Sequence, residues 1–170
     1  EGSGMGEFSS PTSIAIDEQG NFFITDTGNN RIQQFDKDFS YITSWGESGT
    51  GPGEFNNPSG ITIAADGSMY IADTGNHRIQ KYDTNQTYLL SWGTEGSEAG
   101  EFRNPVAIAV DLEGNVYAAD PGNFRVQKFN PRGYFITAFG SQDGDIQFTS
   151  ITDIGVDSIG RIYVADSVNN

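Results

Sequence analysis

The chain of 170 residues contains no cysteine and no long apolar run. The absence of cysteine excludes disulfides, thiolate metal sites and cysteine nucleophiles. No apolar stretch approaches the roughly eighteen residues that a membrane span requires, so we expect no membrane insertion.

Basic residues are also scarce. Nine Lys and Arg residues stand against 23 acidic residues, which gives a formal net charge of −14. Because nucleic-acid affinity depends on cationic contacts to phosphate, we expect no nucleic-acid partner. Anionic membrane surfaces are disfavoured for the same reason. Basic proteins, cations and neutral ligands such as glycans remain open as partners.

Histidine occurs once, in the segment TGNHRIQKY at 74–82. The related segments TGNNRIQQF (27–35) and PGNFRVQKF (121–129) have Asn30 and Phe124 in place of His77. A position that accepts an amide, an imidazole and a phenyl ring does not require imidazole chemistry. We therefore interpret His77 as a residue of a repeated loop, not as a ligand or a base.

The chain repeats itself with a period of 47 residues, shortened to 46 in the last unit. The tripeptide GEF falls at 6–8, 53–55 and 100–102. The runs FFITDTGN, MYIADTGN, VYAADPGN and IYVADSVN begin at Phe22, Met69, Val116 and Ile162. Such self-similarity is typical of repeat architectures. We place the repeats at approximately 1–38, 42–85, 89–132 and 136–170.

Each repeat predicts four short β-strands. In the first repeat these are 14–17, 22–26, 31–36 and 41–45, with turn residues between them and no helical periodicity. The first strand alternates large and small side chains, as in Ile14-Ala15-Ile16, so the bulky face of one sheet can pack on the small face of the next. The pattern predicts an all-β fold, a β-propeller with four-stranded antiparallel blades.

The segment NPSGITIAADGSMYIADTGNHRIQKYD (57–83) resembles an NHL repeat, and the resemblance covers the whole chain, 1–170. It implies a propeller of NHL type, and closed propellers of that kind usually carry five or six blades. The chain holds three full repeats and a partial fourth. We therefore expect it to be a segment of a larger five- or six-bladed propeller. The alternative is that copies self-associate through open blade edges to complete a ring.

An aspartate ends the second strand of every repeat, and an arginine follows five residues later where the chain continues. These residues are Asp26, Arg31, Asp73, Arg78, Asp120, Arg125 and Asp166. They could form a ring of carboxylates for metal binding or acid–base chemistry. Alternatively, each aspartate accepts backbone N–H bonds while the arginine binds a carboxylate or carbonyls. Occurrence in every repeat favours this structural role, because catalytic groups should interrupt the pattern.

The loops that join the fourth strand of one repeat to the first strand of the next are acidic. The candidate binding residues are Glu47, Glu54, Glu95, Glu98, Glu101, Asp143 and Asp145, together with Asp153 at the start of an innermost strand. This face could bind a basic partner or a hard cation such as Ca²⁺. The alternative is a solvated acidic surface. No segment has the D-x-D-x-D-G spacing of a calcium loop, so we predict no metal site, no cofactor and no catalytic residue.

Departures from the repeat are the other places where a function can be sought. Asp153 replaces Ser13 and puts a carboxylate near the mouth of the central channel. In the second repeat, Ala64 replaces the aspartate found at Asp17.

The sequence favours a non-catalytic interaction module, a secreted or cell-surface propeller whose loops bind a protein, peptide or glycan. A structural building block of a surface layer or filament fits the same features. The resemblance implies a third hypothesis, because some NHL propellers are metal-dependent peptidyl-hydroxyglycine lyases that hold the metal through histidines. With one histidine here, such a site would lie in other blades. The chain itself is predicted not to be an enzyme.

Overall fold

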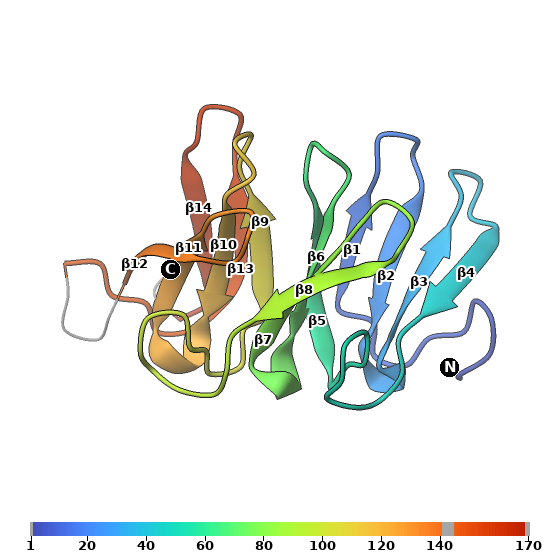
Figure 1. Cartoon of the computed structure of the whole chain (residues 1–170), viewed down its shortest axis with the longest axis horizontal. Coiled ribbons are helices and arrows are strands. Elements are labelled where there is room, and N and C mark those ends of the chain that lie inside the picture. Colours follow the sequence, from blue (N-terminus) through green and yellow to red (C-terminus); the bar gives the residue numbers. More distant parts are fainter. Residues whose placement is uncertain (1, 141–144, 169–170) are drawn as a thin grey trace.

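The computed structural model describes residues 2–140 and 145–168, which form four β-sheets standing side by side (Figure 1). Three sheets have four strands in chain order, and the fourth has two. We call the sheets blades 1 to 4. The predicted all-β propeller architecture, with three full four-stranded antiparallel blades and one partial blade, is confirmed.

The strands of blade 1 are β1 (Ser13–Ile16), β2 (Phe22–Asp26), β3 (Arg31–Phe35) and β4 (Tyr41–Trp45). Blade 2 contains β5 (Pro58–Ile63), β6 (Met69–Asp73), β7 (Arg78–Tyr82) and β8 (Tyr88–Trp92). Blade 3 contains β9 (Ala107–Val110), β10 (Val116–Asp120), β11 (Arg125–Phe129) and β12 (Phe135–Phe139), and blade 4 contains β13 (Ile151–Val156) and β14 (Ile162–Asp166). Three 3₁₀ turns link second and third strands: η1 (Thr27–Asn29), η2 (Thr74–Asn76) and η3 (Pro121–Asn123). None of the helices among the described residues has the length and apolar character to cross a membrane.

The second strands of blades 2 and 3 are buried on both faces. In blade 2, β6 pairs with β5 and β7, so that Met69 lies opposite Ile63 on one side and Tyr82 on the other. Successive side chains of a strand point to opposite faces, and neighbouring blades cover both faces of β6. All five residues of β6 are buried as a result, and the same holds for β10.

The innermost strands β1, β5, β9 and β13 contact one another in succession. Ile61 and Ile63 of β5 pack in one cluster with the small Ala15 of β1, as the alternation of large and small residues predicts. The spacing is tight at Gly60, where an added Cβ would lie 2.7 Å from the carbonyl oxygen of Val106. A side chain at this position would push blades 2 and 3 apart.

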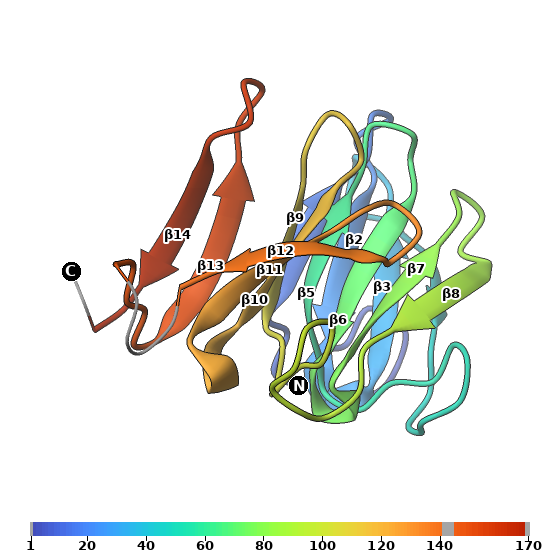
Figure 2. The same ribbon diagram turned by 60° about the vertical axis from the view of Figure 1, so that its left-hand side comes forward.

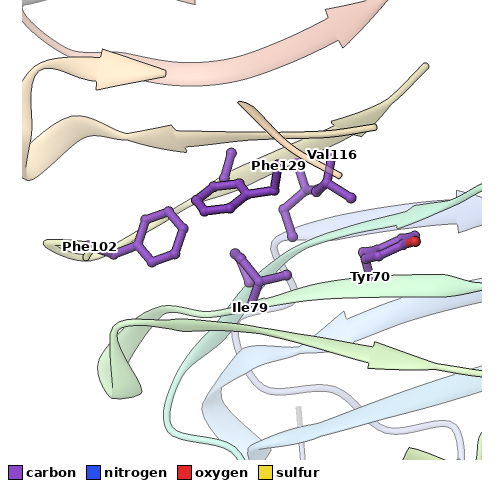
Figure 3. Close-up of a cluster of buried hydrophobic side chains, with 8 residues drawn as sticks. Tyr70, Ile79, Phe102, Val116 and Phe129 are labelled. Carbon is purple, nitrogen blue, oxygen red and sulfur yellow. The ribbon is translucent and has the colours of Figure 1, made fainter. Parts of the chain in front are cut away.

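The core between blades 2 and 3 contains the buried rings of Tyr70, Phe102 and Phe129 (Figure 3). Phe102 comes from the loop between β8 and β9 and is fully buried, with its ring centroid 5.5 Å from that of Phe129. Gly93 makes room for it: this residue has φ 105°, and an added Cβ would lie 2.5 Å from Cδ2 of Phe102. The glycine after Trp92 therefore allows the phenylalanine of the GEF motif to enter the core.

The two ends of the row of blades are uncovered. Ile14 of β1 is 55% exposed, whereas the equivalent Ile61 and Ile108 are 5% and 6% exposed, and Ile16 is 57% exposed. At the other end, the β13–β14 hairpin is the last element of the row (Figure 2), and Tyr163 is exposed on it. These faces carry the same apolar pattern as the covered ones. Self-association through them remains a prediction.

Replacement of Phe102 by Ala should destabilise the protein strongly. The change removes a ring from a closely packed cluster, and we expect the free energy of unfolding to fall by about 3–5 kcal/mol. Urea denaturation followed by tryptophan fluorescence measures the loss. The control is Phe39→Ala, which removes a ring that is 74% exposed and should have a much smaller effect. Equal losses for the two variants would contradict the assignment of Phe102 to the core.

Candidate functional site

Two sets of connections lie at the same end of the blades, at the lower edge of Figure 1. They are the loops between the fourth and first strands and the 3₁₀ turns η1 to η3. We call this end the loop face. The opposite end carries the short turns between the first and second strands, and we call it the turn face.

A buried aspartate holds the loop face together in each full blade. In blade 2, Oδ2 of Asp73 accepts hydrogen bonds from Nε of Arg78 at 2.7 Å and from Nε2 of Gln80 at 2.9 Å. Nδ2 of Asn76 donates to the same oxygen at 2.9 Å, and Oδ1 accepts the backbone N–H of Asn56 at 2.8 Å. The equivalent bonds of blades 1 and 3 are made by Asp26 and Asp120.

The arginine of this network then binds the loop backbone. Nη1 of Arg78 donates to the carbonyl of Thr50 at 2.7 Å, and Nη2 donates to the carbonyls of Gly51 and Glu54 at 2.8 and 2.9 Å. Arg31 and Arg125 make the matching bonds in blades 1 and 3. In blade 4, Asp166 accepts the backbone N–H groups of Thr149 and Ser150. The fold therefore occupies all of these carboxylates and guanidinium groups.

The acidic residues of the loops fall into two groups. Glu54 and Glu101 are tied into their own loops: the N–H of Gly51 donates to Oε2 of Glu54 at 2.8 Å, and the N–H of Glu98 donates to Oε2 of Glu101 at 2.9 Å. The exposed residues whose side chains bond to nothing within the described part of the chain are Glu47, Glu95, Glu98 and Asp145. Asp143 lies outside the described residues. The second group presents carboxylates to a partner, and its binding role remains a prediction.

Asp153 lies at the inner edge of blade 4, on its uncovered face. It follows a register shift between β13 and β14, pairs with Ala165, and accepts the N–H of Ile154 at Oδ1 over 2.9 Å. The equivalent residue of blade 3, Ala107, is buried against blade 4. Asp153 thus places a carboxylate where the preceding blade has a methyl group.

His77 has a local structural role. It adopts a left-handed conformation with φ 54° after η2, and its Nδ1 accepts the backbone N–H of Asn104 at 3.2 Å. In blade 1, Oδ1 of Asn30 accepts the N–H of Asn57 at 2.7 Å in the same way. The imidazole replaces an amide oxygen as an acceptor between blades.

Metal ligands do not gather in the part of the chain that the structure describes. No group of three or more His, Asp or Glu residues there is placed to hold a metal ion. This finding concerns residues 2–140 and 145–168 alone, and the absence of a cofactor remains a prediction.

An ionic cluster on the turn face was not apparent from the sequence. In blade 3, Oδ2 of Asp111 accepts the Tyr117 hydroxyl at 3.1 Å and lies 3.4 Å from Nζ of Lys128. Burial alone would raise the pKa of Asp111, but hydrogen bonds from Asn115 and Tyr117 and the charge of Lys128 outweigh it and lower the pKa. Tyr117 raises the pKa of Lys128, against burial, and Asp111 adds to the increase.

The signal that could have revealed this cluster is the shared repeat position of Lys81 and Lys128 on the third strand. A lysine that recurs on the third strand lies next to the second strand and so near the aspartate in the turn before it. This arrangement predicts an ion pair between the lysine and the aspartate. The pattern is incomplete in blade 2, where the aspartate is Ala64.

Residues 7–166 match the family described as the SMP-30/gluconolactonase/LRE-like region. A streptogramin B lyase structure superposes with a TM-score of 0.74 at 16% identity, covering 96% of this chain and 50% of that chain. The virginiamycin B lyase of Staphylococcus aureus gives 0.72 at 15% identity, covering 94% and 50%. These identities show a shared fold, and the chain spans about half the length of both lyase structures.

Protein lin-41 of Caenorhabditis elegans is 46% identical over 43 residues, which are 25% of this chain and 4% of that protein. The match is short, so the predicted assignment to NHL repeats is not established. The family whose sequence pattern extends over most of the chain is the lactonase-like one.

The prediction that the chain is not an enzyme is contradicted by these comparisons. The matching family is described by the name of a lactonase, and both similar structures are lyases. The prediction rested on the absence of a recognisable catalytic set and of cysteine in the sequence. A fold does not determine function, so the absence of a motif in the repeats does not exclude catalysis.

Replacement of Asp73 by Asn should destabilise the loop face. An amide removes the charge that four donors share and leaves the guanidinium of Arg78 without its buried carboxylate. We expect the free energy of unfolding to fall by about 3–5 kcal/mol, measured by urea denaturation. The control is Asp38→Asn, since Asp38 pairs with Lys37 at the surface and should contribute little. A small effect of Asp73→Asn would show that the network does not hold the blade.

The Asp111–Lys128 pair should make stability depend on pH at both extremes. The lowered pKa of Asp111 stabilises the fold above its unfolded value near 4, and this is lost as pH falls through the folded pKa. The raised pKa of Lys128 stabilises the fold below its unfolded value near 10.4, and this is lost as pH rises through the folded pKa. Urea titrations at several pH values measure the difference in the free energy of unfolding between wild type and Asp111→Asn. This difference should be constant between about pH 5 and 9 and should shrink outside that range. A difference that is independent of pH would contradict the pair.

Proposed function

The chain belongs to the SMP-30/gluconolactonase/LRE-like family, and we propose that it forms part of an enzyme that hydrolyses a small lactone or related ester at the inner edge of the blades. The observation that carries this proposal is the family match over residues 7–166. Because the chain spans about half the length of the similar lyase structures, we propose that it contributes part of the ring.

Asp153 is the residue of this chain that we assign to the substrate. The recurring aspartates of the loop face are occupied by their arginines, and Glu54 and Glu101 are held by their own loops. Asp153 interrupts the repeat, and its Oδ2 makes no bond within residues 2–140 and 145–168. Asp153 is exposed at the inner edge of blade 4, so its carboxylate is accessible to a small ligand there.

The chemistry assigned to Asp153 is that of a general base. In lactone hydrolysis, a water oxygen attacks the acyl carbon, the ring C–O bond breaks, and the water proton is finally carried by the alcohol product. A carboxylate beside the water accepts the proton during the attack, which contributes about 10²–10⁴-fold to the rate of such reactions.

A second function is favoured by the exposed carboxylates of Glu47, Glu95 and Glu98, which no other side chain of the described residues neutralises. We propose that this part of the loop face binds a basic segment of a partner protein outside the cytoplasm. Long-range attraction between the negative face and a basic partner would raise the rate of association. This role is compatible with catalysis at the inner edge.

The test of catalysis uses the full-length protein and a panel of five- and six-membered aldonolactones, with acid release followed by a pH indicator. Asp153→Asn keeps the size of the side chain and removes its basicity, so kcat/KM should fall about 100-fold while the melting temperature is unchanged. The control is Asp38→Asn, which neutralises an exposed surface carboxylate with no assigned role and should leave kcat/KM unaltered. Full activity of Asp153→Asn would remove this residue from the mechanism, and a protein that opens no lactone of the panel would overturn the proposed function.

A further inference from the structure

The first turn of the blades on the turn face is built around one aspartate in three of the four blades. In blade 3, Oδ1 of Asp111 accepts the backbone N–H groups of Glu113 at 3.0 Å and Asn115 at 2.8 Å. The same pair of bonds is made by Asp17 in blade 1 and Asp157 in blade 4. Blade 2 has Ala64 at this position, and no carboxylate of its own replaces the missing Oδ2.

Blade 2 nevertheless has a tyrosine and a lysine at the positions of the two residues that bind Oδ2 of Asp111 in blade 3. Tyr70 takes the place of Tyr117, and Nζ of Lys81 lies 5.0 Å from the centroid of the Tyr70 ring, compared with 4.9 Å for Lys128 over Tyr117. Tyr70 is 1% exposed, and its hydroxyl makes no hydrogen bond within residues 2–140 and 145–168. Figure 3 shows this hydroxyl pointing away from Phe102, out of the aromatic cluster.

Two further donors lack the carboxylate that their counterparts have. Nζ of Lys81 donates to the carbonyl oxygen of Pro131 at 3.3 Å and pairs with no acid among the described residues. The backbone N–H of Asp66 corresponds to a group that bonds Oδ1 in the other blades, and here it is without a partner in the described chain. The Asp66 side chain turns instead to the N–H of Ser68, at 2.9 Å. A hydroxyl, an ammonium and an amide thus remain around the space where an aspartate is missing.

This space opens into a pocket of about 340 Å³ between blades 2 and 3. The residues that line it include Ala64, Asp66 and Tyr70 from blade 2 and Asp111, Glu113 and Pro131 from blade 3. Lys81 lies beside the lining, where its Nζ donates to the carbonyl oxygen of Pro131. The equivalent pocket between blades 3 and 4 contains Asp111, Tyr117 and Lys128, which satisfy one another. In the pocket beside blade 2, the hydroxyl of Tyr70 lacks the carboxylate that Tyr117 binds in blade 3, and the acidic residues Asp66, Asp111 and Glu113 form the rest of the polar lining.

We propose that the pocket between blades 2 and 3 binds a small zwitterion, such as a free amino acid, through a carboxylate that takes the place of the aspartate missing from blade 2. The ligand carboxylate accepts bonds from the hydroxyl of Tyr70, the ammonium of Lys81 and the N–H of Asp66, and bonds to charged groups are the stronger ones. The positive group of the ligand faces the acidic side chains of Asp66 and Glu113. A purely anionic ligand would meet these carboxylates unpaired.

Thermal unfolding of the full-length protein in increasing β-alanine tests the site. Binding to the folded state should raise the melting temperature in a saturable manner, by about 3–6 °C at tenfold excess over the dissociation constant. Ala64→Asp supplies the carboxylate from the protein and should abolish this saturable rise. Because zwitterions also act as general osmolytes, the quantity to compare is the difference between wild type and Ala64→Asp.

Tyr70→Phe tests the site independently of how Ala64→Asp folds, and a double variant shows whether Ala64→Asp still folds into a protein that can bind. Tyr70→Phe removes only the unpartnered hydroxyl and should weaken β-alanine binding by about tenfold. The double variant Ala64→Asp/Asp111→Ala has the aspartate in blade 2 and lacks it in blade 3. Tyr117 and Lys128 then supply the donors for the ligand carboxylate, and the saturable rise in melting temperature should return. Asp17→Ala in the Ala64→Asp background is the matched control, because blade 1 has Phe23 and Gln34 at these positions and should show no response.

Three results would overturn the proposal. One is a rise of equal size in wild type and Ala64→Asp, which would be a solvent effect. Another is an equal response to methylammonium chloride, which would mean that the acidic rim binds a cation without the carboxylate. The third is the absence of any saturable rise for wild type while the double variant Ala64→Asp/Asp111→Ala responds, which would show that the blade 2 pocket is closed to ligands.

Discussion

Every full blade depends on one buried carboxylate. Asp73 and its two counterparts lie where a loop between blades, a 3₁₀ turn and the third strand meet, and each is fully buried. A buried charge is stable only when its lone pairs are satisfied, so the arginine, asparagine and glutamine that bind it must recur with it. The segment GN-x-R-x-Q therefore returns in each full blade as one unit. The repeated sequence follows from the need to satisfy the same charge three times.

The fold could be predicted from the sequence because its signals are local. Alternating residues and glycine-containing turns define strands, and the bounds of β2 and β4 agree with those expected from blade 1. The nesting of Ile61 and Ile63 with Ala15 also follows from the alternation of large and small residues. The burial of Phe102 could not be derived in this way. It depends on the conformation of Gly93, which brings a loop residue into the core between two blades.

The candidate sites could be predicted only in part. The sequence locates the acidic loops, but it cannot separate Glu54, whose carboxylate accepts a backbone N–H, from Glu47, whose carboxylate is free of such a bond in the described chain. Both are loop glutamates, and the difference lies in how the backbone turns. The same limit applies to Lys81 and Tyr70, which come together only when β6 and β7 pair. Side chains on different strands meet through the register, and composition does not reveal it.

Both proposed sites lie at positions where one blade differs in sequence from the others. Asp153 adds a charge at the inner edge, where blade 3 has the buried Ala107. Ala64 removes a charge on the turn face, where blade 3 has the paired Asp111. In both cases blade 3 has the other residue at the equivalent position of the same backbone. Comparison of the two blades therefore separates the effect of the side chain from that of the fold. Because the two departures lie in different blades and toward opposite ends of the strands, we expect the two proposed sites to be independent, so that loss of one leaves the other in place.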